Sequence, residues 1–221
     1  MPPQPQQLVM PFAPMVSYQP EDFIAGNANA RALDLVTRWP DWPYSLVVVH
    51  GPQGCGKTHL CHLFARRAQA TFIDPARVGT VPADQLLAGN HGWILDGLEA
   101  VADPAALAQL INHARARGDY VLMTASAPPA ALASGLPDLQ SRLAAMPEVA
   151  LGLPDDALLA AVLAKSFADR QLRVVPDALV YAVTRLERSF AAAQHFAARV
   201  DEASLATGKR VGLAFMREML R

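Results

Sequence analysis

Apolar and polar positions along the middle of the chain follow two different periods. Short apolar runs of strand length predict four buried strands, at 45–50, 71–73, 93–96 and 120–124. The segments between them carry apolar residues at helical spacing and predict three helices, at 57–69, 82–88 and 104–117. Strands that alternate with helices indicate a parallel sheet covered on both faces. We therefore expect an α/β fold with ligands at the carboxyl ends of the strands.

From residue 154 onwards the pattern is helical throughout. It predicts four helices, at 155–170, 177–186, 189–207 and 212–220. Asp155 and Asp177 are the predicted N-caps of two of them, because each stands beside a proline that suits a helix start. The sequence therefore predicts three parts: an extended N-terminal tail at 1–20, an α/β domain at 21–153 and a small all-helical domain at 154–221.

The first predicted strand runs into the stretch SLVVVHGPQGCGKTHL, which fits the P-loop motif G-x-x-x-x-G-K-[ST]. Glycines in such a loop let backbone N–H groups approach a phosphate, and the following helix points its N-terminus at the same anion. Lys57 adds a positive charge, and the Thr58 hydroxyl is a magnesium ligand. We therefore predict that a nucleotide binds to Gly51, Gly54, Cys55, Gly56, Lys57, Thr58 and His59.

Upstream of the loop, Phe23 and Ile24 form an aromatic and apolar pair ahead of a helical pattern that ends before Pro40. A pair in this position often packs on a nucleotide base. A helix that only covers the core gives the same pattern, so both interpretations stay open.

The predicted strand at 93–96 ends on Asp96, a carboxylate that can hold Mg²⁺ together with Thr58. Many P-loop ATPases carry a second acid at the next position, where it orients the attacking water, but this chain has Gly97 there and Glu99 two positions later. We therefore expect the site to bind ADP or ATP with Mg²⁺ better than it hydrolyses ATP. Thr124, at the end of the next strand, either senses the terminal phosphate or is an ordinary strand-end threonine.

Composition narrows the classes of protein. Of 221 residues, 52% are hydrophobic, which is ample for a packed core. The 19 basic and 20 acidic residues balance, so the overall charge gives no support to a protein that tracks nucleic-acid phosphates. Two cysteines suit a reducing cytosol. The chain shows no signal-peptide pattern and no apolar run long enough to cross a bilayer, so we expect a cytoplasmic protein.

The N-terminal tail has no charged side chain in its first twenty residues and is rich in Pro and Gln. Its apolar residues stand at alternate positions and suit docking in a groove, although on composition alone the tail is a bland leader. The later segment GLPDLQSRL predicts a short helix capped by Asp138 or Ser141. Leu139 and Leu143 then face the core and Arg142 faces outward, where the simplest alternative role is a surface salt bridge.

Four stretches together resemble the Hda family, bacterial AAA+ relatives of the replication initiator DnaA that lack its DNA-binding domain. The resemblance lies in GKTHLCHLFA, WILDGLE, GLPDLQSRL and DEASLATGKRVGLAFMREML. It implies an AAA+ P-loop core with a five-stranded parallel sheet, followed by a small helical lid. The tail also resembles the peptide Q-L-x-L-P-[FL] with which such proteins hold the sliding clamp (β subunit), and the matching residues are Gln7, Leu8, Met10, Pro11 and Phe12.

The resemblance assigns Arg142 to the arginine finger of the family's S-R-[FL] motif, which is supplied to the nucleotide of a neighbouring subunit. It implies an ADP-bound protein on the clamp that stimulates hydrolysis of ATP held by DnaA and so limits re-initiation. A homo-oligomer stays an open alternative. Two other classes of function also stay open: an autonomous P-loop ATPase such as a helicase loader, and a nucleotide-binding scaffold for DnaA without catalytic effect.

The chain departs from the family pattern at two places. Ala191 stands where the third lid helix usually carries the sensor II arginine, and Arg188 lies one turn earlier. Either Arg188 takes over that role or the lid does not touch the phosphates. Ser126 and Ala127 stand where relatives often have Asp-Arg, which implies a different partner geometry or nucleotide preference.

Overall fold

The computed structural model describes residues 18–132 and 136–220. In this part of the chain, five parallel strands form one sheet in the order β2-β3-β4-β1-β5. The strands are β1 (Leu46–His50), β2 (Thr71–Phe72), β3 (Gly92–Leu95), β4 (Tyr120–Ala125) and β5 (Glu148–Ala150). The expected five-stranded parallel sheet is therefore confirmed. No apolar run located β5, because it has only three residues and pairs with β1 at the sheet edge.

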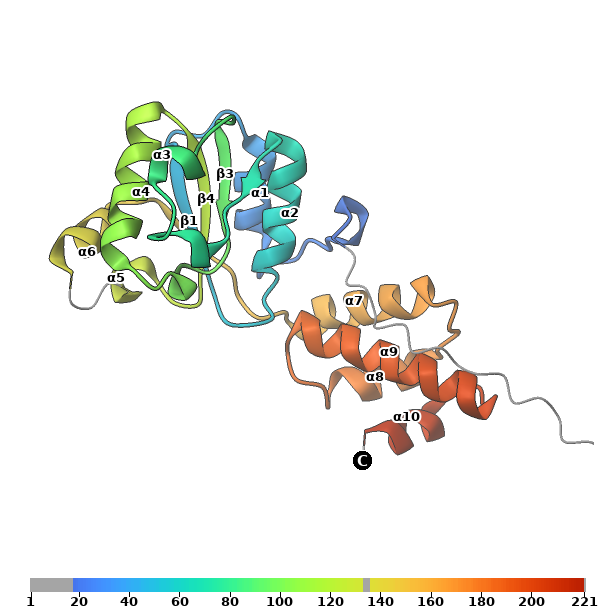
Figure 1. Cartoon of the computed structure of the whole chain (residues 1–221). Helices are drawn as coiled ribbons and strands as arrows, with labels where there is room; N and C mark the ends of the chain where they lie inside the picture. Colours follow the sequence, from blue (N-terminus) through green and yellow to red (C-terminus); the bar gives the residue numbers. More distant parts are fainter. Residues whose placement is uncertain (1–17, 133–135, 221) are drawn as a thin grey trace, which may run out of the picture.

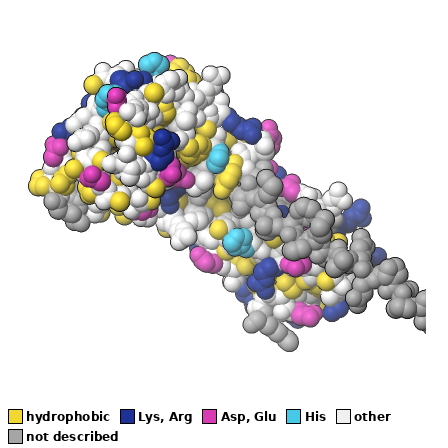
Figure 2. Space-filling model, viewed as in Figure 1, with side chains coloured by type: hydrophobic (Ala, Val, Ile, Leu, Met, Phe, Trp, Pro, Cys, Tyr) yellow, Lys and Arg dark blue, Asp and Glu magenta, His cyan; other side chains and the backbone are white. Residues whose placement is uncertain are grey.

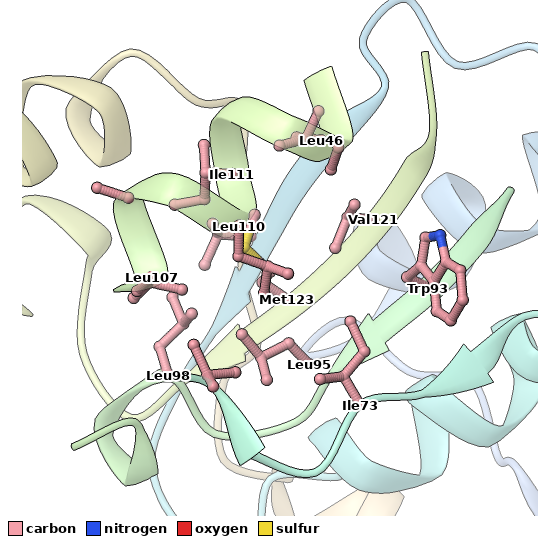
Figure 3. Close-up of a cluster of buried hydrophobic side chains, with 14 of the residues drawn as sticks. Leu46, Ile73, Trp93, Leu95, Leu98, Leu107, Leu110, Ile111, Val121 and Met123 are labelled. Carbon is pink, nitrogen blue, oxygen red and sulfur yellow. The ribbon is translucent and has the colours of Figure 1, made fainter. Parts of the chain in front are cut away.

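Side chains that alternate along the strands supply two separate cores. Leu46, Leu95 and Met123 point to one face and pack with α4 (Pro104–Arg117), as the labelled side chains in Figure 3 show. Val49 and Leu122 point to the other face, which the helices α1 (Ala30–Arg38) and α2 (Lys57–Ala68) cover. A strand buried on both faces reads as a continuous apolar run, which explains the run in β1.

The remaining helices of the α/β core fill the two faces and the loops (Figure 1). The α-helices are α1 (Ala30–Arg38), α2 (Lys57–Ala68), α3 (Ala83–Leu86), α5 (Pro129–Leu132) and α6 (Pro137–Ala144). The short 3-10 helices are η1 (Pro20–Asp22), η2 (Pro75–Arg77) and η3 (Leu98–Ala100). Leu139 and Leu143 of α6 are buried in the α4-side core, as the sequence pattern predicted.

The C-terminal helices form a second lobe with its own apolar cluster (Figure 1). They are α7 (Asp156–Asp169), α8 (Pro176–Val183), α9 (Phe190–Thr207) and α10 (Leu213–Met219). Residues 18–29 form an N-terminal strap that joins the two lobes. Phe23 packs with the core on the sheet face that α1 and α2 cover, and Ile24 packs with the apolar cluster of the C-terminal helices. The domain boundaries stay a prediction.

Helix capping follows the sequence at some ends and departs from it at others. Asp155 caps α7 by accepting from Leu158 N–H at 2.8 Å, as predicted. The prediction for Asp177 was wrong: α8 begins at Pro176, so this carboxylate lies in the first turn. The predicted cap of α6 was also wrong, because Pro137 begins that helix and Asp138 already lies inside it. In both cases proline at the first helical position starts the helix earlier than the acidic residue.

The molecular surface is mixed in charge. On the face shown in Figure 2, Lys and Arg side chains alternate with Asp and Glu over both lobes. Within 18–132 and 136–220, no helix has the length and apolar character to cross a membrane.

Candidate nucleotide-binding site

The loop between β1 and α2 has the backbone that its glycines predict. Gly54 and Gly56 have φ of 75° and 97°, in the left-handed region that glycine adopts most easily. Gly51 serves a different purpose, because a Cβ there would lie 2.3 Å from the backbone oxygen of Leu151. Two of the three glycines thus shape the turn, and the third lets β1 and the end of β5 approach closely.

Lys57 begins α2 and curls back over the loop. Its Nζ donates to the carbonyl oxygens of Gly51 at 2.7 Å and Pro52 at 2.9 Å. Cys55 lies beneath the loop with 1% of its surface exposed, and its Sγ lies 4.0 Å from Lys57 Nζ. Burial raises the pKa of the Cys55 thiol, and the nearby Lys57 opposes this shift only in part. The cysteine is therefore a neutral core residue.

Three side chains meet where α2 begins and where β3 and β4 end. Thr58 Oγ1 donates to Asp96 Oδ2 at 2.8 Å, and Thr124 Oγ1 donates to Asp96 Oδ1 at 2.5 Å. Gly97 N–H donates to the Thr124 hydroxyl at 2.8 Å. The Asp96 carboxylate is therefore held on both sides, next to the hydroxyl that the motif assigns to Mg²⁺. Carboxylate and hydroxyl oxygens suit this ion, so the residues present fit a magnesium site.

Gly97 also has a constrained backbone, with φ of 92°. A residue with a side chain is strained in this conformation. The glycine at this position therefore belongs to the turn that follows β3, and a second acid here would require the turn to change.

A pocket of about 370 Å³ opens above the loop, between the N-terminal strap and the helical lobe. It contains most of the predicted nucleotide-binding residues, namely Phe23, Ile24, Gly54, Gly56, Lys57, Thr58 and His59. Gly51, Cys55 and Asp96 do not line it. The sequence analysis named Ala191 only as the sensor II position, and the lining residues that it missed are Tyr18, Asp22, Asn29, Gln53, Val162, Phe190, Gln194 and His195. Most of them come from the strap and the helical lobe. No sequence motif predicts that these two segments approach the loop.

Aromatic rings build the strap side of the pocket. Phe23 and Tyr18 meet the His59 ring edge to face, with ring centroids 5.2 and 5.6 Å apart. Tyr18 also stacks on His62 at 4.2 Å. Burial lowers the pKa of His59 and that of His62, so the neutral imidazoles are favoured. Asn29 is buried and fixes the strap, because it accepts from Gly26 N–H and donates to the Ile24 carbonyl, at 2.8 and 2.9 Å.

The lid side of the pocket begins at the first turn of α9. Phe190 N–H donates to the Gly54 carbonyl at 3.0 Å, which attaches this helix directly to the phosphate-binding loop. Ala191 lines the pocket. Arg188 does not: it pairs with Asp156 at 2.9 Å and is largely exposed. Among the described lining residues, Lys57 is the one lysine or arginine.

Arg142 lies away from this pocket. It projects from α6, on the α4 side of the sheet, and Figure 1 shows α6 and the helical lobe at opposite sides of the core. Its guanidinium pairs with Asp138 on the same helix and with Asn112 on α4. The surface salt bridge anticipated as the simplest role is thus present. The tail residues predicted to bind a clamp, 7–12, lie outside the described residues.

Comparison with known proteins identifies the fold. The family model of the bacterial DnaA ATPase domain matches residues 16–91, from the strap to the residue before β3. Domain III of Thermotoga maritima DnaA superposes with a TM-score of 0.77 at 17% identity, covering 96% of this chain and 98% of that one. This chain has the AAA+ fold. No curated protein matches it.

Two further structures extend the likeness. AMPPCP-bound DnaA from Aquifex aeolicus gives a TM-score of 0.71 at 15% identity and covers 86% of this chain and 67% of that one. The Thermotoga maritima RuvB Holliday junction branch migration motor gives 0.64 at 16% identity, with 87% and 67% covered. The core and the helical lobe are therefore arranged as in these DnaA and RuvB structures.

Proposed function

We propose that this chain is a nucleotide-bound AAA+ regulator that stimulates hydrolysis of the ATP held by DnaA, and that Arg142 is the residue it supplies. The observation that carries the proposal is the position of Arg142. Arg142 belongs to α6, which lies on the opposite side of the core from the helical lobe, and it does not line the chain's own pocket, so it serves another subunit's nucleotide or none.

The chain's own site supports binding of ADP or ATP. Gly54 and Gly56 shape a loop around the start of α2, where no side chain of the described residues caps the first N–H groups. Such a helix terminus attracts phosphate. Lys57 lies in the pocket lining and can exchange its bonds to loop carbonyls for phosphate oxygens. Thr58 and Asp96 would hold Mg²⁺, which neutralises phosphate charge when bound.

The same site supports slow hydrolysis by the chain alone. Gly97 occupies the position after Asp96 and adopts a left-handed backbone, so no acid is held there to orient water. Glu99 lies exposed in η3 and does not line the pocket. The lid adds no arginine to the lining, since Arg188 pairs with Asp156 and Ala191 is apolar. We expect bound nucleotide to stabilise this chain rather than to turn over.

The proposed partners are DnaA and the sliding clamp. The match of residues 16–91 to the DnaA ATPase model supports DnaA, because it makes this chain a relative of the module on which it would act. The tail peptide supports the clamp by its resemblance alone. Together they describe a protein on the clamp that resets DnaA to its ADP form after replication starts, which limits re-initiation.

The test is ATP hydrolysis by DnaA with clamp-loaded DNA and each variant of this chain. An arginine finger supplied in trans accelerates hydrolysis by about 10³- to 10⁵-fold. Arg142→Ala should therefore remove nearly all of the stimulation while clamp binding and fold persist. Arg142→Lys keeps the charge without the planar fork and should rescue little.

The control is Arg188→Ala, which removes an exposed arginine of the lid. It should stimulate DnaA like the unmodified chain. Full stimulation by Arg142→Ala would overturn the finger assignment. Rapid ATP turnover by the isolated chain would instead favour an autonomous ATPase, and no stimulation by any form would favour a scaffold.

A further inference from the structure

Arg142 does not extend freely into solvent. Its Nε donates to Asp138 Oδ2 at 2.9 Å and its Nη2 donates to Asp138 Oδ1 at 2.8 Å, a side-on bidentate pair one turn apart on α6. Its Nη1 donates to the Asn112 side-chain oxygen, which comes from α4. Two helices thus hold one guanidinium, and 28% of the Arg142 side chain is exposed.

We propose that Asp138 and Asn112 are positioning residues, which hold the Arg142 guanidinium in a fixed orientation for a phosphate of a partner's nucleotide. This inference rests on the function proposed above for Arg142. It adds the two residues on which the orientation of that group depends.

Arg142 keeps donors for a phosphate after its bonds to Asp138 and Asn112 are made. A guanidinium has five N–H groups in a rigid plane. The bonds to Asp138 and Asn112 use three of them, one on each nitrogen. One N–H therefore remains on each of the two terminal nitrogens, and these donors can bond to phosphate oxygens. The carboxylate occupies the Nε edge, so the remaining donors all lie on the terminal nitrogens.

The energetics favour a role in orientation over a role in stability. Asp138 has 63% of its side chain exposed, and ion pairs so exposed contribute little to folding. An unrestrained arginine loses much rotamer freedom when it binds a phosphate. Holding the group beforehand removes part of that cost, and a small misplacement of a catalytic group can lower a rate about 100-fold.

Asn112 gives the cleanest test, because it comes from a different helix. Asn112→Ala, at an exposed position of α4, improves helix propensity and changes no residue of α6. The matched control is Gln109→Ala, which removes an exposed amide one turn earlier on the same helix. Asp138→Asn keeps the shape of the carboxylate without its charge, and Asp138→Glu keeps the charge.

The assay measures DnaA-bound ATP hydrolysis against concentration of this chain, with DNA-loaded clamp present. We expect Asp138→Asn to lower the maximal rate by about 10-fold and Asn112→Ala by about 3-fold, within the cost of a misplaced group. The half-saturating concentration should change by less than about twofold, since docking is intact. Asp138→Glu should retain more activity than Asp138→Asn, and Gln109→Ala should be unaffected.

The Arg142→Ala background separates the two proposals. If positioning is right, Asp138→Asn and Asn112→Ala have no further effect there, because their partner is gone. An unchanged or raised maximal rate for both single variants, while Arg142→Ala abolishes stimulation, would overturn the positioning role and leave the finger intact. Stimulation that survives Arg142→Ala would instead overturn the finger. A larger half-saturating concentration with an unchanged rate would assign the pair to docking and also overturn positioning.

Discussion

Thr58 and Asp96 stand 38 positions apart in the chain, yet the threonine hydroxyl donates to the aspartate carboxylate at 2.8 Å. The contact joins the first turn of α2 to the end of β3. Thr124 in β4 holds the second oxygen of the same carboxylate. The position of the Asp96 carboxylate is therefore set by α2, β3 and β4, which meet at the carboxyl end of the sheet. A group fixed in this way needs little rearrangement to receive a metal ion, and this is the preorganisation that binding sites require.

Lys57→Ala should weaken ADP and ATP binding by about 10- to 100-fold, the usual range for a lost hydrogen bond to a charged group. Lys57 is the one lysine or arginine among the described lining residues, so no neighbour replaces its charge. Titration calorimetry with Mg²⁺ present measures the effect. Lys209→Ala, on the exposed end of the helical lobe, is the control. Equal affinities for the two variants would place the nucleotide elsewhere.

Ser189→Ala should lower the free energy of unfolding by about 1 kcal/mol, the typical cost of losing an N-cap. Ser189 is buried and accepts from Ala192 N–H at 3.1 Å, at the end of α9 that contacts Gly54. Urea denaturation measures the change. Glu202→Ala, exposed in the middle of the same helix, should change it by less than about 0.5 kcal/mol. Nucleotide affinity should fall with Ser189→Ala alone.

Acidification should loosen the N-terminal strap through His59. Burial lowers the pKa of this imidazole, Asp22 and the Gln19 carbonyl oppose the shift, and His62 adds to it. The unfolded chain therefore binds the proton first, near pH 6.5, and stability falls as the pH drops below that value. His59→Gln should lose less stability between pH 7.5 and 5.5 than the unmodified chain.

Thermal unfolding at the two pH values measures this dependence. His113→Gln, on α4 across the sheet, should keep the full loss. An equal loss of stability between pH 7.5 and 5.5 in both variants would show that protonation of His59 does not destabilise the strap.

The tail prediction follows from sequence alone, since the anchors lie outside the described residues. Replacing Leu8 and Phe12 with alanine removes two apolar groups, each worth about 1.5 to 3 kcal/mol when buried. Clamp binding should fall by at least about 100-fold while nucleotide binding is unchanged. The matched control replaces Gln4 and Gln6 with alanine. Surface plasmon resonance on immobilised clamp compares them, and equal binding would show that the tail is only a leader.

Local chemistry is what the sequence by itself determined. The apolar runs and glycines located β1 and the phosphate-binding loop, because a buried parallel strand must be apolar and a left-handed turn favours glycine. Lys57, Thr58 and Asp96 followed from their places in this pattern. Helix starts were predicted less accurately. Both α6 and α8 begin at a proline, earlier than the predicted caps.

Only the tertiary structure decided which distant segments meet. No pattern around Tyr18 predicts a pocket, and only the family resemblance pointed to the start of α9, yet the strap and the first turn of α9 close over the loop. The three-residue strand β5 was invisible for the same reason, since its pairing with β1 defines it rather than its composition. The contact between Arg142 and Asn112 depends on how α6 packs against α4. No local sequence pattern determines how close these two helices lie.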